Sequence, residues 1–600
     1  MQNNRRPQPG GTPAEMVLLG TMAGLLAAVS ALVWVSVTVG YSLAGREVPK
    51  SGFFPVVFGL LEGSVKWLPE STYVAVGVLV LLVVLAIVAA VLVRRRRQKV
   101  SRVDKSAQYL GRGRDIEALS RRNATDTARR LGVEADEPGL TLGRTVGDDQ
   151  TAMTTWEDML ILIAGPRTQK TTAYGVPSIL SAPGACLVTS NKRDVVDATR
   201  GPRSEKGPVL VFDPQGIARE PETWWWNPLD YVTDEVQAAK LAEHFASGSR
   251  AEGARTDAYF EPAGQKLLSS LLLAAALDRR PITDVYRWLT RPTDETSVHV
   301  LTDHGYELQA DQVAGVIQLN DKQRDGVFGS AQQMVECLTN RTAARWVTPS
   351  GPASRERFDA HDFVRSGGTL YSLSKEGSGT AGPLVTALTV AVVEAAEDLA
   401  VDSPGGRLAT PLVGVLDEAA NVCRWRQLPN LYSHYGSRGI VLLTILQSWS
   451  QGAEVWGEAG IKKLWSASNV RIYGGGVAEP AFLEDLAKLI GQYDRQTGSV
   501  TINHGGMTAR GSRSSSTQLT RERIMDVDDL AALPKGRSVL LASGSRPTLI
   551  RTQPWMTGPH AQEVKASIAA NDPQASRTLH EVEETVSEIQ QEAARERRAG

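Results

Sequence analysis

The chain has 600 residues, enough for roughly three or four domain-sized units. A hydrophobic content of 42% and a charged content of 22% are ordinary for a folded protein, and a net charge of −1 argues against a wholly basic protein that coats nucleic acid. Cys186, Cys337 and Cys423 lie far apart, and the eight histidines show no ligand spacing, so we expect a reducing compartment, no disulfide scaffold and no structural metal.

Two long uncharged runs lie near the N-terminus. No charged residue lies between Glu15 and Arg46, and the second run covers Ser71–Val93. Each exceeds the ~20 apolar residues that a membrane-spanning helix needs, so the sequence predicts two transmembrane helices, residues 16–43 and 71–93. A cleaved signal peptide is the alternative for the first run, although its apolar core would be shorter, about 7–15 residues.

Basic residues flank both runs, with Arg5 and Arg6 before the first and Arg94–Arg97 after the second. Positive flanks mark the cytoplasmic side of a membrane protein. The expected location is therefore the plasma membrane of the cell, with both termini in the cytoplasm and a short loop outside.

Apolar strands alternate with helices from residue 151 onward. The strand DMLILIAG is followed by the helix TTAYGVPSIL, which Pro177 should bend, and by the strands GACLVTS and PVLVFDP. Residues 233–350 carry helical spacing only and predict an all-α insertion. Strand patterns return with GTLYSLS, PLVGVLDEA, GIVLLTILQS and NVRIYGGG, and SVLLASGSRPTLIRTQPW predicts a hairpin at the sheet edge. This alternation predicts a parallel sheet covered on both faces, followed by a loosely attached charged tail.

The segment AGPRTQKTT resembles a phosphate-binding loop with one substitution. In the pattern G-x-x-x-x-G-K-[ST], Lys170 and Thr171 are in place, but Gln169 replaces the second glycine. Lys170 would reach the β- and γ-phosphates, and Thr171 would bind Mg²⁺. An ordinary strand–turn–helix with a surface lysine is the alternative for the loop alone. The candidate nucleotide-binding residues are Ala164, Gly165, Pro166, Arg167, Thr168, Gln169, Lys170, Thr171 and Thr172.

Polar residues also follow two other predicted strands. Asp417 and Glu418 end an apolar strand, as in a Walker B element, so Asp417 would hold Mg²⁺ and Glu418 would polarise the attacking water. Asp417 as a helix cap is the alternative. Gln447 ends the strand thirty residues later and could sense the γ-phosphate. Arg438 could be an arginine finger for a neighbouring subunit, or a solvated arginine.

Together these motifs resemble the TraG/TraD-like type IV coupling proteins of conjugation systems, most closely an actinobacterial branch. LDEAANV…LPNLYSHYGSRGIVLLTILQSWSQ, LVTSNKRDVVDATR, VLVFDPQG, WWWNPLDYV and LPKGRSVLLASGSRPTLIR match family blocks in order. The resemblance implies an α/β, RecA-like P-loop ATPase behind two membrane helices. It assigns catalytic roles to Glu418, Gln447 and Arg438 and metal binding to Thr171 and Asp417.

The resemblance also implies cofactors and partners. The cofactors would be ATP and Mg²⁺, and the partners DNA as a single strand attached to a relaxase, the relaxosome, the secretion channel and five further copies in a homo-hexamer. Asn191, Lys192 and Asp213 also match family blocks, and Trp224–Trp226 favours packing at a domain junction over base stacking.

The expected domain boundaries follow the patterns above. They are 1–15 (N-terminal tail), 16–43 and 71–93 (transmembrane helices), 44–70 (external loop), 94–150 (basic linker and hairpin), 151–232 and 351–558 (the two parts of the nucleotide-binding domain), 233–350 (all-α insertion) and 559–600 (charged tail).

Three functions stay open on the sequence. The first is an ATPase that pumps relaxase-bound DNA into a type IV secretion channel, the second a coupling ATPase that delivers proteins, and the third a docking receptor that has lost hydrolysis. A chromosome-segregation pump is a more distant alternative, since those motors lack the helical insertion. Because Lys170, Thr171, Asp417, Glu418 and Gln447 are all retained, we interpret the loop as a working variant and predict that Gln169→Gly keeps or strengthens ATP binding.

Overall fold

The computed structural model describes residues 14–48, 52–96, 101–249, 257–349, 355–376, 381–503 and 512–599. The chain divides into two compact units, residues 1–100 with 590–600, and residues 101–589. Each unit is described by itself.

The smaller unit contains three helices, α1 (Ala14–Leu43), α2 (Phe53–Leu61) and α3 (Pro69–Arg96). Helices α1 and α3 pack against each other, and a small core forms where Val37 and Tyr41 of α1 meet Val56 of α2. The Tyr41 hydroxyl donates a hydrogen bond to the carbonyl of Lys66 (2.9 Å), which fixes the connection between α2 and α3.

The predicted membrane spans are not found. Among the described residues, no helix is both long and apolar enough to cross a membrane. The prediction rested on the apolar length of the two runs and on their basic flanks. In α1, the hydroxyls of Ser36 and Thr38 bond to the backbone carbonyls of Leu32 and Trp34. The prediction of two transmembrane helices over 16–43 and 71–93 is therefore wrong, and so is the plasma-membrane location with cytoplasmic termini that rested on it.

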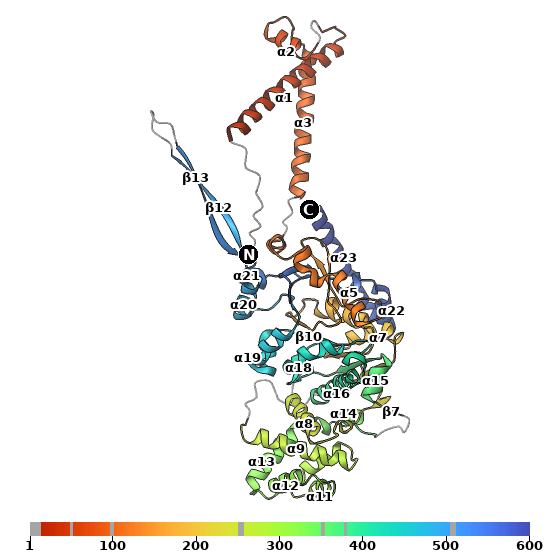
Figure 1. Cartoon of the computed structure of the whole chain (residues 1–600). Helices are drawn as coiled ribbons and strands as arrows, with labels where there is room; N and C mark the ends of the chain where they lie inside the picture. The colour runs from red at the N-terminus through yellow and green to blue at the C-terminus, as the bar shows by residue number, and fades with distance from the viewer. Residues whose placement is uncertain are drawn as a thin grey trace. The chain divides into compact units, whose positions relative to one another are not determined.

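A single mixed sheet organises the larger unit (Figure 1). In the described residues its eleven strands lie in the order β2-β1-β15-β14-β11-β3-β10-β9-β4-β8-β5. All strands from β11 to β5 run parallel, whereas β14, β15, β1 and β2 add antiparallel pairs on one side. The strand bounds are β1 Thr141–Thr145, β2 Thr151–Met153, β3 Leu160–Ile163, β4 Cys186–Ser190, β5 Val209–Phe212, β8 Thr369–Leu373, β9 Leu412–Leu416, β10 Ile440–Leu446, β11 Val470–Tyr473, β14 Arg537–Ala542 and β15 Thr548–Arg551.

The predicted parallel sheet is confirmed, and both of its faces are covered. Along β3, Ile161 and Ile163 belong to one hydrophobic cluster, and Leu160 and Leu162 belong to another on the opposite face. A strand buried on both faces is expected to be apolar throughout, which explains the run LILI. The predicted C-terminal hairpin, β14–β15, is also confirmed, but it is not at the edge, because β1 pairs with β15 and β2 continues the sheet.

The covering helices come from several parts of the chain. They and the remaining elements are α4 Arg102–Ser106, α5 Arg121–Leu131, α6 Val176–Ser181, α7 Asp194–Ser204, α15 Ala360–Ser366, α16 Gly382–Val401, α17 Ala419–Val422, α18 Leu428–Tyr435, α19 Trp449–Ala467, α20 Pro480–Ile490, the hairpin β12 (Gln492–Asn503) and β13 (Ser512–Arg523), and α21 Val527–Ala531.

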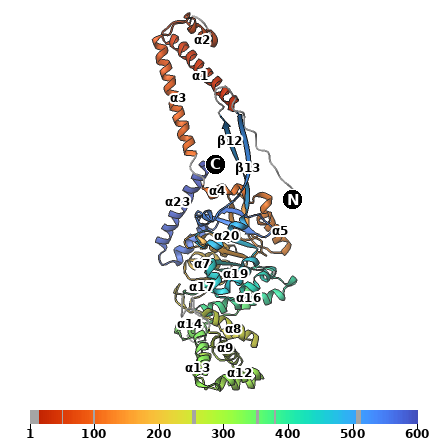
Figure 2. The same ribbon diagram turned by 90° about the vertical axis from the view of Figure 1, so that its left-hand side faces the viewer.

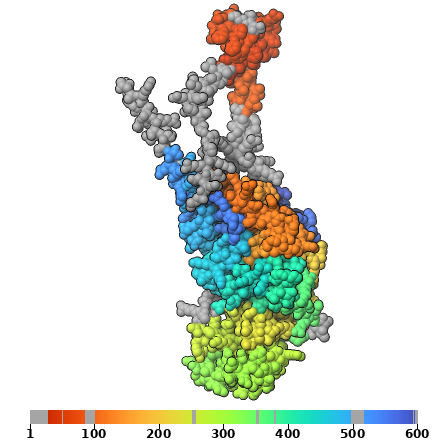
Figure 3. Space-filling model, in the orientation of Figure 1, coloured from red at the N-terminus to blue at the C-terminus, as the bar shows by residue number. Residues whose placement is uncertain are grey.

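A block of helices lies between β5 and β8 in the chain. Its members are α8 Glu235–Ser249, α9 Phe260–Leu277, α10 Thr283–Leu289, α11 Thr296–Asp303, α12 Glu307–Ile317, α13 Asp321–Met334 and α14 Arg341–Trp346. Figure 3 shows these yellow-green residues gathered into one continuous mass. Helix α8 packs on α16, which joins the block to the sheet domain.

The three consecutive tryptophans lie where this helical block meets the sheet. Trp224 and Trp226 are buried, and the ring of Trp224 contacts those of Phe212, Trp346 and Phe358. The predicted packing role is therefore confirmed for these two residues. The short strands β6 (Trp224–Trp225) and β7 (Glu356–Arg357) pair in parallel. This pairing joins the segment that enters the helical block to the segment that leaves it.

The C-terminal segment forms two helices, α22 (Ala561–Asn571) and α23 (Ala575–Ala599). Helix α22 lies beside α7 in both ribbon views (Figures 1 and 2). The Ser567 hydroxyl donates to the carbonyl of Asp197 (2.6 Å) and accepts from the amide of Gly201 (3.0 Å). These contacts fix α22 on the sheet domain, which a loosely attached tail would not show.

Candidate active site

The loop after β3 leaves the sheet through a tight contact with another strand end. The amide of Gly165 donates to the carbonyl of Gly475 (2.9 Å), just after β11. A Cβ at Gly165 would lie 1.9 Å from the carbonyl oxygen of Gly476, so only glycine fits there. Gly165, rather than Ala164, is therefore the residue at which the loop requires glycine. Gly475 and Gly476 were not predicted as part of the site, although the run GGG after a strand was an available signal.

Two side-chain-bearing residues of the loop adopt left-handed backbone conformations, Arg167 (φ 61°) and Gln169 (φ 67°). The φ of Gln169 explains why the usual pattern has glycine at this position. The carbonyl of Gln169 accepts from the amide of Ala173 (2.8 Å), so the strained residue leads directly into the next helix.

That helix begins with a wide turn, Thr171–Gly175, and continues as α6. Pro177 is the second residue of α6 and follows the wide turn within the same helix. Proline has no amide to donate and disturbs the helical turn before it, so the predicted distortion of the helix is found as the wide turn Thr171–Gly175.

Lys170 points to the end of β9. Its side chain is 9% exposed, and Nζ lies 3.0 Å from Oε1 of Glu418. The other carboxylate oxygen of Glu418 accepts a hydrogen bond from Nε2 of Gln447 (2.8 Å). Glu418 itself has a left-handed backbone (φ 53°), which turns its side chain toward both partners. The structure thus brings together three of the predicted residues.

Asp417 and Thr171 form a second contact beside the first. The Thr171 hydroxyl donates to Oδ2 of Asp417 (3.0 Å), whereas Oδ1 of Asp417 is buried and has no hydrogen-bond partner among the residues that the structure describes. Burial, and next the neighbouring carboxylate of Glu418, raise the pKa of Asp417 to about 6. A buried carboxylate with one unused oxygen is costly unless a cation or a proton is present, so the donor set fits a divalent ion such as Mg²⁺.

The strand order explains this convergence. Strand β10 lies between β3 and β9 in the parallel sheet. The carboxyl ends of parallel strands share one edge, so the residues that follow β3, β9 and β10 meet there. Gln447 follows β10, which is the middle strand of the three. The end of β10 therefore lies between the end of β3, which leads to Lys170, and the end of β9, which carries Asp417 and Glu418.

Arg438 lies elsewhere in the same subunit. It precedes β10, whereas Gln447 follows it, and seven residues of strand span about 23 Å. Its guanidinium pairs with Oε1 of Glu397 on α16 (2.7 Å). Arg438 is therefore not part of this subunit's cluster, and its action on a neighbouring subunit stays a prediction.

Asp213, Asn191 and Lys192, the other residues that match family blocks, make other contacts or are exposed. Asp213 accepts hydrogen bonds from the amides of Ile217 (2.7 Å) and Ala218 (2.9 Å) and shapes the turn after β5. The side-chain amide of Asn191 donates to Glu376, and Lys192 is exposed.

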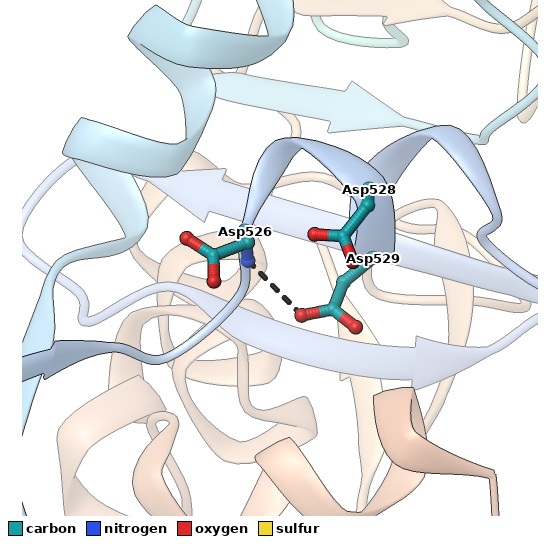
Figure 4. Close-up of side chains that lie close together, drawn as sticks. All are labelled: Asp526, Asp528 and Asp529. Carbon is teal, nitrogen blue, oxygen red and sulfur yellow. Dashed lines mark hydrogen bonds between the residues drawn. The ribbon is translucent and has the colours of Figure 1, made fainter.

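Three carboxylates near α21 come close enough to suggest a cation site, Asp526, Asp528 and Asp529 (Figure 4). Their contacts account for them without an ion. Asp526 and Asp529 form a capping box at the start of α21, and Nε of Arg102 lies 3.1 Å from Oδ1 of Asp529.

A parallel sheet whose strand ends bring together a lysine, a hydroxyl and two carboxylates is the arrangement of α/β nucleoside triphosphatases. A match to a known protein family specifies this class of protein further. Residues 411–535 match the family model described as the TraM recognition site of TraD and TraG. This match confirms the resemblance to type IV coupling proteins over the segment that holds Asp417, Glu418, Arg438 and Gln447.

Solved structures that resemble this chain include the bacterial conjugative coupling protein TrwBdeltaN70 in its unbound monoclinic form (TM-score 0.49, 15% identity, 74% of this chain and 93% of that chain). They also include TrwB in complex with the ATP analogue ADPNP (0.49, 17%, 71% and 92%) and VirB4 of Thermoanaerobacter pseudethanolicus (0.39, 12%, 72% and 100%). No curated protein matches the sequence.

Proposed function

We propose that this chain is an ATP-hydrolysing coupling protein that moves relaxase-bound DNA into a conjugative secretion channel. The observation that carries the proposal is the cluster formed by Lys170, Thr171, Asp417, Glu418 and Gln447. The TraD and TraG family match supports the conjugative role, and the solved complex of TrwB with the ATP analogue ADPNP supports ATP as the ligand to test.

Each residue has a defined task in that reaction. Bound ATP and Mg²⁺ supply the phosphoryl group for transfer to water and the charge that neutralises it. Lys170 would hold the terminal phosphates, and Thr171 and Asp417 would hold the metal, for which Oδ1 of Asp417 has no hydrogen-bond partner among the described residues. Glu418 accepts a proton from the attacking water, and Gln447 fixes the position of Glu418.

The Lys170–Glu418 ion pair has a consequence for this mechanism. A phosphate at the loop competes with Glu418 for Lys170. When Lys170 turns to the phosphate, one oxygen of Glu418 becomes available as a base while Gln447 still holds the other. Nucleotide binding thus prepares the base for hydrolysis.

ATP turnover of the full chain, with and without single-stranded DNA, tests the proposal. We expect turnover that DNA stimulates, its loss in Lys170→Ala, and wild-type turnover in Lys488→Ala, a control at an exposed lysine that pairs with Asp485. Equal turnover in wild type and Lys170→Ala would contradict the ATPase and favour a docking receptor. Turnover that neither single-stranded nor duplex DNA changes would contradict DNA as the cargo.

A further inference from the structure

A cavity of about 330 Å³ lies beside the phosphate loop, entirely within the larger unit. Thr171, Thr172 and Val176 form one side, and Arg193 with the beginning of α7 forms a second. Trp555, Met556 and residues of the C-terminal helices α22 and α23 form the rest. None of the contacts among Lys170, Glu418 and Gln447 involves this space.

The walls of the cavity combine apolar and hydrogen-bonding side chains. Val176, Met556 and Val582 are buried and give it an apolar lining. Thr578, Glu581 and Thr585 of α23 line it as well and offer oxygen atoms. A flat, mostly apolar ligand with hydrogen-bond donors at its edge suits such walls, and the volume is within the range of small-ligand pockets.

The C-terminal wall is held by specific contacts. A guanidinium nitrogen of Arg193 donates to the carbonyl of Asn571 at the end of α22 (3.0 Å). The hydroxyl of Thr578, in the first turn of α23, donates to Asp572 (2.5 Å). Val582 is 7% exposed, and Leu579 packs against the same hydrophobic cluster. The wall is therefore part of the folded domain.

The position of the cavity matches one end of a nucleotide. Glu418 and Gln447 mark the γ-phosphate end of the site, and neither lines the cavity. Thr172 does line it, on the first turn of the helix after Lys170, which is where the phosphate nearest the ribose would lie. A nucleotide that extends away from Glu418 would therefore place its nucleoside in this space.

We propose that this cavity is the nucleoside half of the nucleotide site, and that the C-terminal helix α23 supplies its outer wall. A purine base lies against Val176, Met556 and Val582, and Thr578, Glu581 and Thr585 accept hydrogen bonds from the base amino group or the ribose hydroxyls. The inference rests on the proposed function, because it requires phosphates at Lys170. It makes the C-terminal helix part of the nucleotide site and a determinant of base preference.

Binding of ATP and of inorganic tripolyphosphate to the full chain, measured by calorimetry, tests the inference. In Thr585→Trp and Glu581→Trp an indole fills the cavity, so we expect roughly ten-fold or greater weakening of ATP binding. Tripolyphosphate, which has no nucleoside, should bind these variants as it binds wild type. Glu583→Trp, at an exposed position of α23 that does not line the cavity, is the matched control and should leave both affinities unchanged.

The outcomes separate the inference from the function on which it rests. If both cavity variants bind ATP as wild type does while Lys170→Ala does not, the cavity inference is wrong and the ATPase proposal survives. If the cavity variants weaken tripolyphosphate as much as ATP, the effect is on the loop and the inference is wrong. If Lys170→Ala binds ATP normally, the proposed function itself is contradicted. Thermal unfolding of each variant shows whether it has folded.

Discussion

Gln169 and Glu418 adopt the same unusual backbone conformation on opposite sides of the site, but they differ in what the side chain does. Glu418 (φ 53°) bonds to both Lys170 and Gln447. In the described part of the chain, the side chain of Gln169 (φ 67°) makes no hydrogen bond or ion pair. A left-handed non-glycine residue costs of order 1–3 kcal/mol. At Glu418 that cost positions the proposed catalytic base, whereas at Gln169 only the backbone is needed.

Replacement of Glu418 is expected to have the largest effect. Glu418→Gln keeps the hydrogen bond with Gln447 but cannot accept the proton of water, so turnover should fall by roughly 10²–10⁴-fold. ATP affinity should stay equal or rise, because Lys170 and Thr171 remain and the carboxylate that competes with phosphate for Lys170 is gone. Steady-state turnover and calorimetry measure the two effects, with Glu583→Gln as the control. Turnover close to wild type would remove Glu418 from the base role.

Gly165→Ala is expected to disturb the loop itself. The added Cβ would lie 1.9 Å from the carbonyl oxygen of Gly476, so one of the two strand ends must move. We expect a loss of about 1–3 kcal/mol in the free energy of unfolding, together with weaker ATP binding. Gly329→Ala in α13 is the matched control, since its Cβ would meet no atom within 4 Å and should stabilise the helix slightly. An unchanged unfolding midpoint in Gly165→Ala would show that the loop is not held by this contact.

Gln447→Ala should weaken hydrolysis less than the loss of Glu418. It removes one hydrogen bond to a charged group, worth about 1.5–3 kcal/mol, so turnover should fall by roughly ten- to 100-fold. Double-mutant measurements with Glu418→Gln should show no further loss, because Gln447 acts through Glu418. Additive losses would mean that Gln447 acts on the phosphate directly.

Gln169→Gly should have the smallest effect, and one of opposite sign. Removal of the side chain relieves the left-handed strain, so the free energy of unfolding should rise by about 1 kcal/mol and ATP binding should stay equal or become tighter. Glu418→Gly, which relieves similar strain, should instead abolish turnover. Chemical denaturation and ATP binding of the pair would sharpen the contrast. A large loss of activity in Gln169→Gly would show that its side chain has a role of its own.

The sequence predicted the site better than it predicted the N-terminal unit. Buried parallel strands are apolar along their length, so β3, β4, β9 and β10 were readable, and the residues after them share an edge by geometry. The membrane prediction rested on the apolar length of the two N-terminal runs and on their basic flanks, but no helix of the described residues is long and apolar enough to cross a membrane.

The amino-acid sequence by itself determined the strands, the helical block between them and the residue types at the strand ends, because periodicity and local composition carry that information. Only the tertiary structure decided which strands are neighbours, and therefore that Lys170 and Gln447 both reach the carboxylate of Glu418. It also decided that Gly476 fixes the position of Gly165 and that α23 lines the cavity beside Thr172. Contacts between segments hundreds of residues apart depend on packing of the whole domain, which no local pattern records.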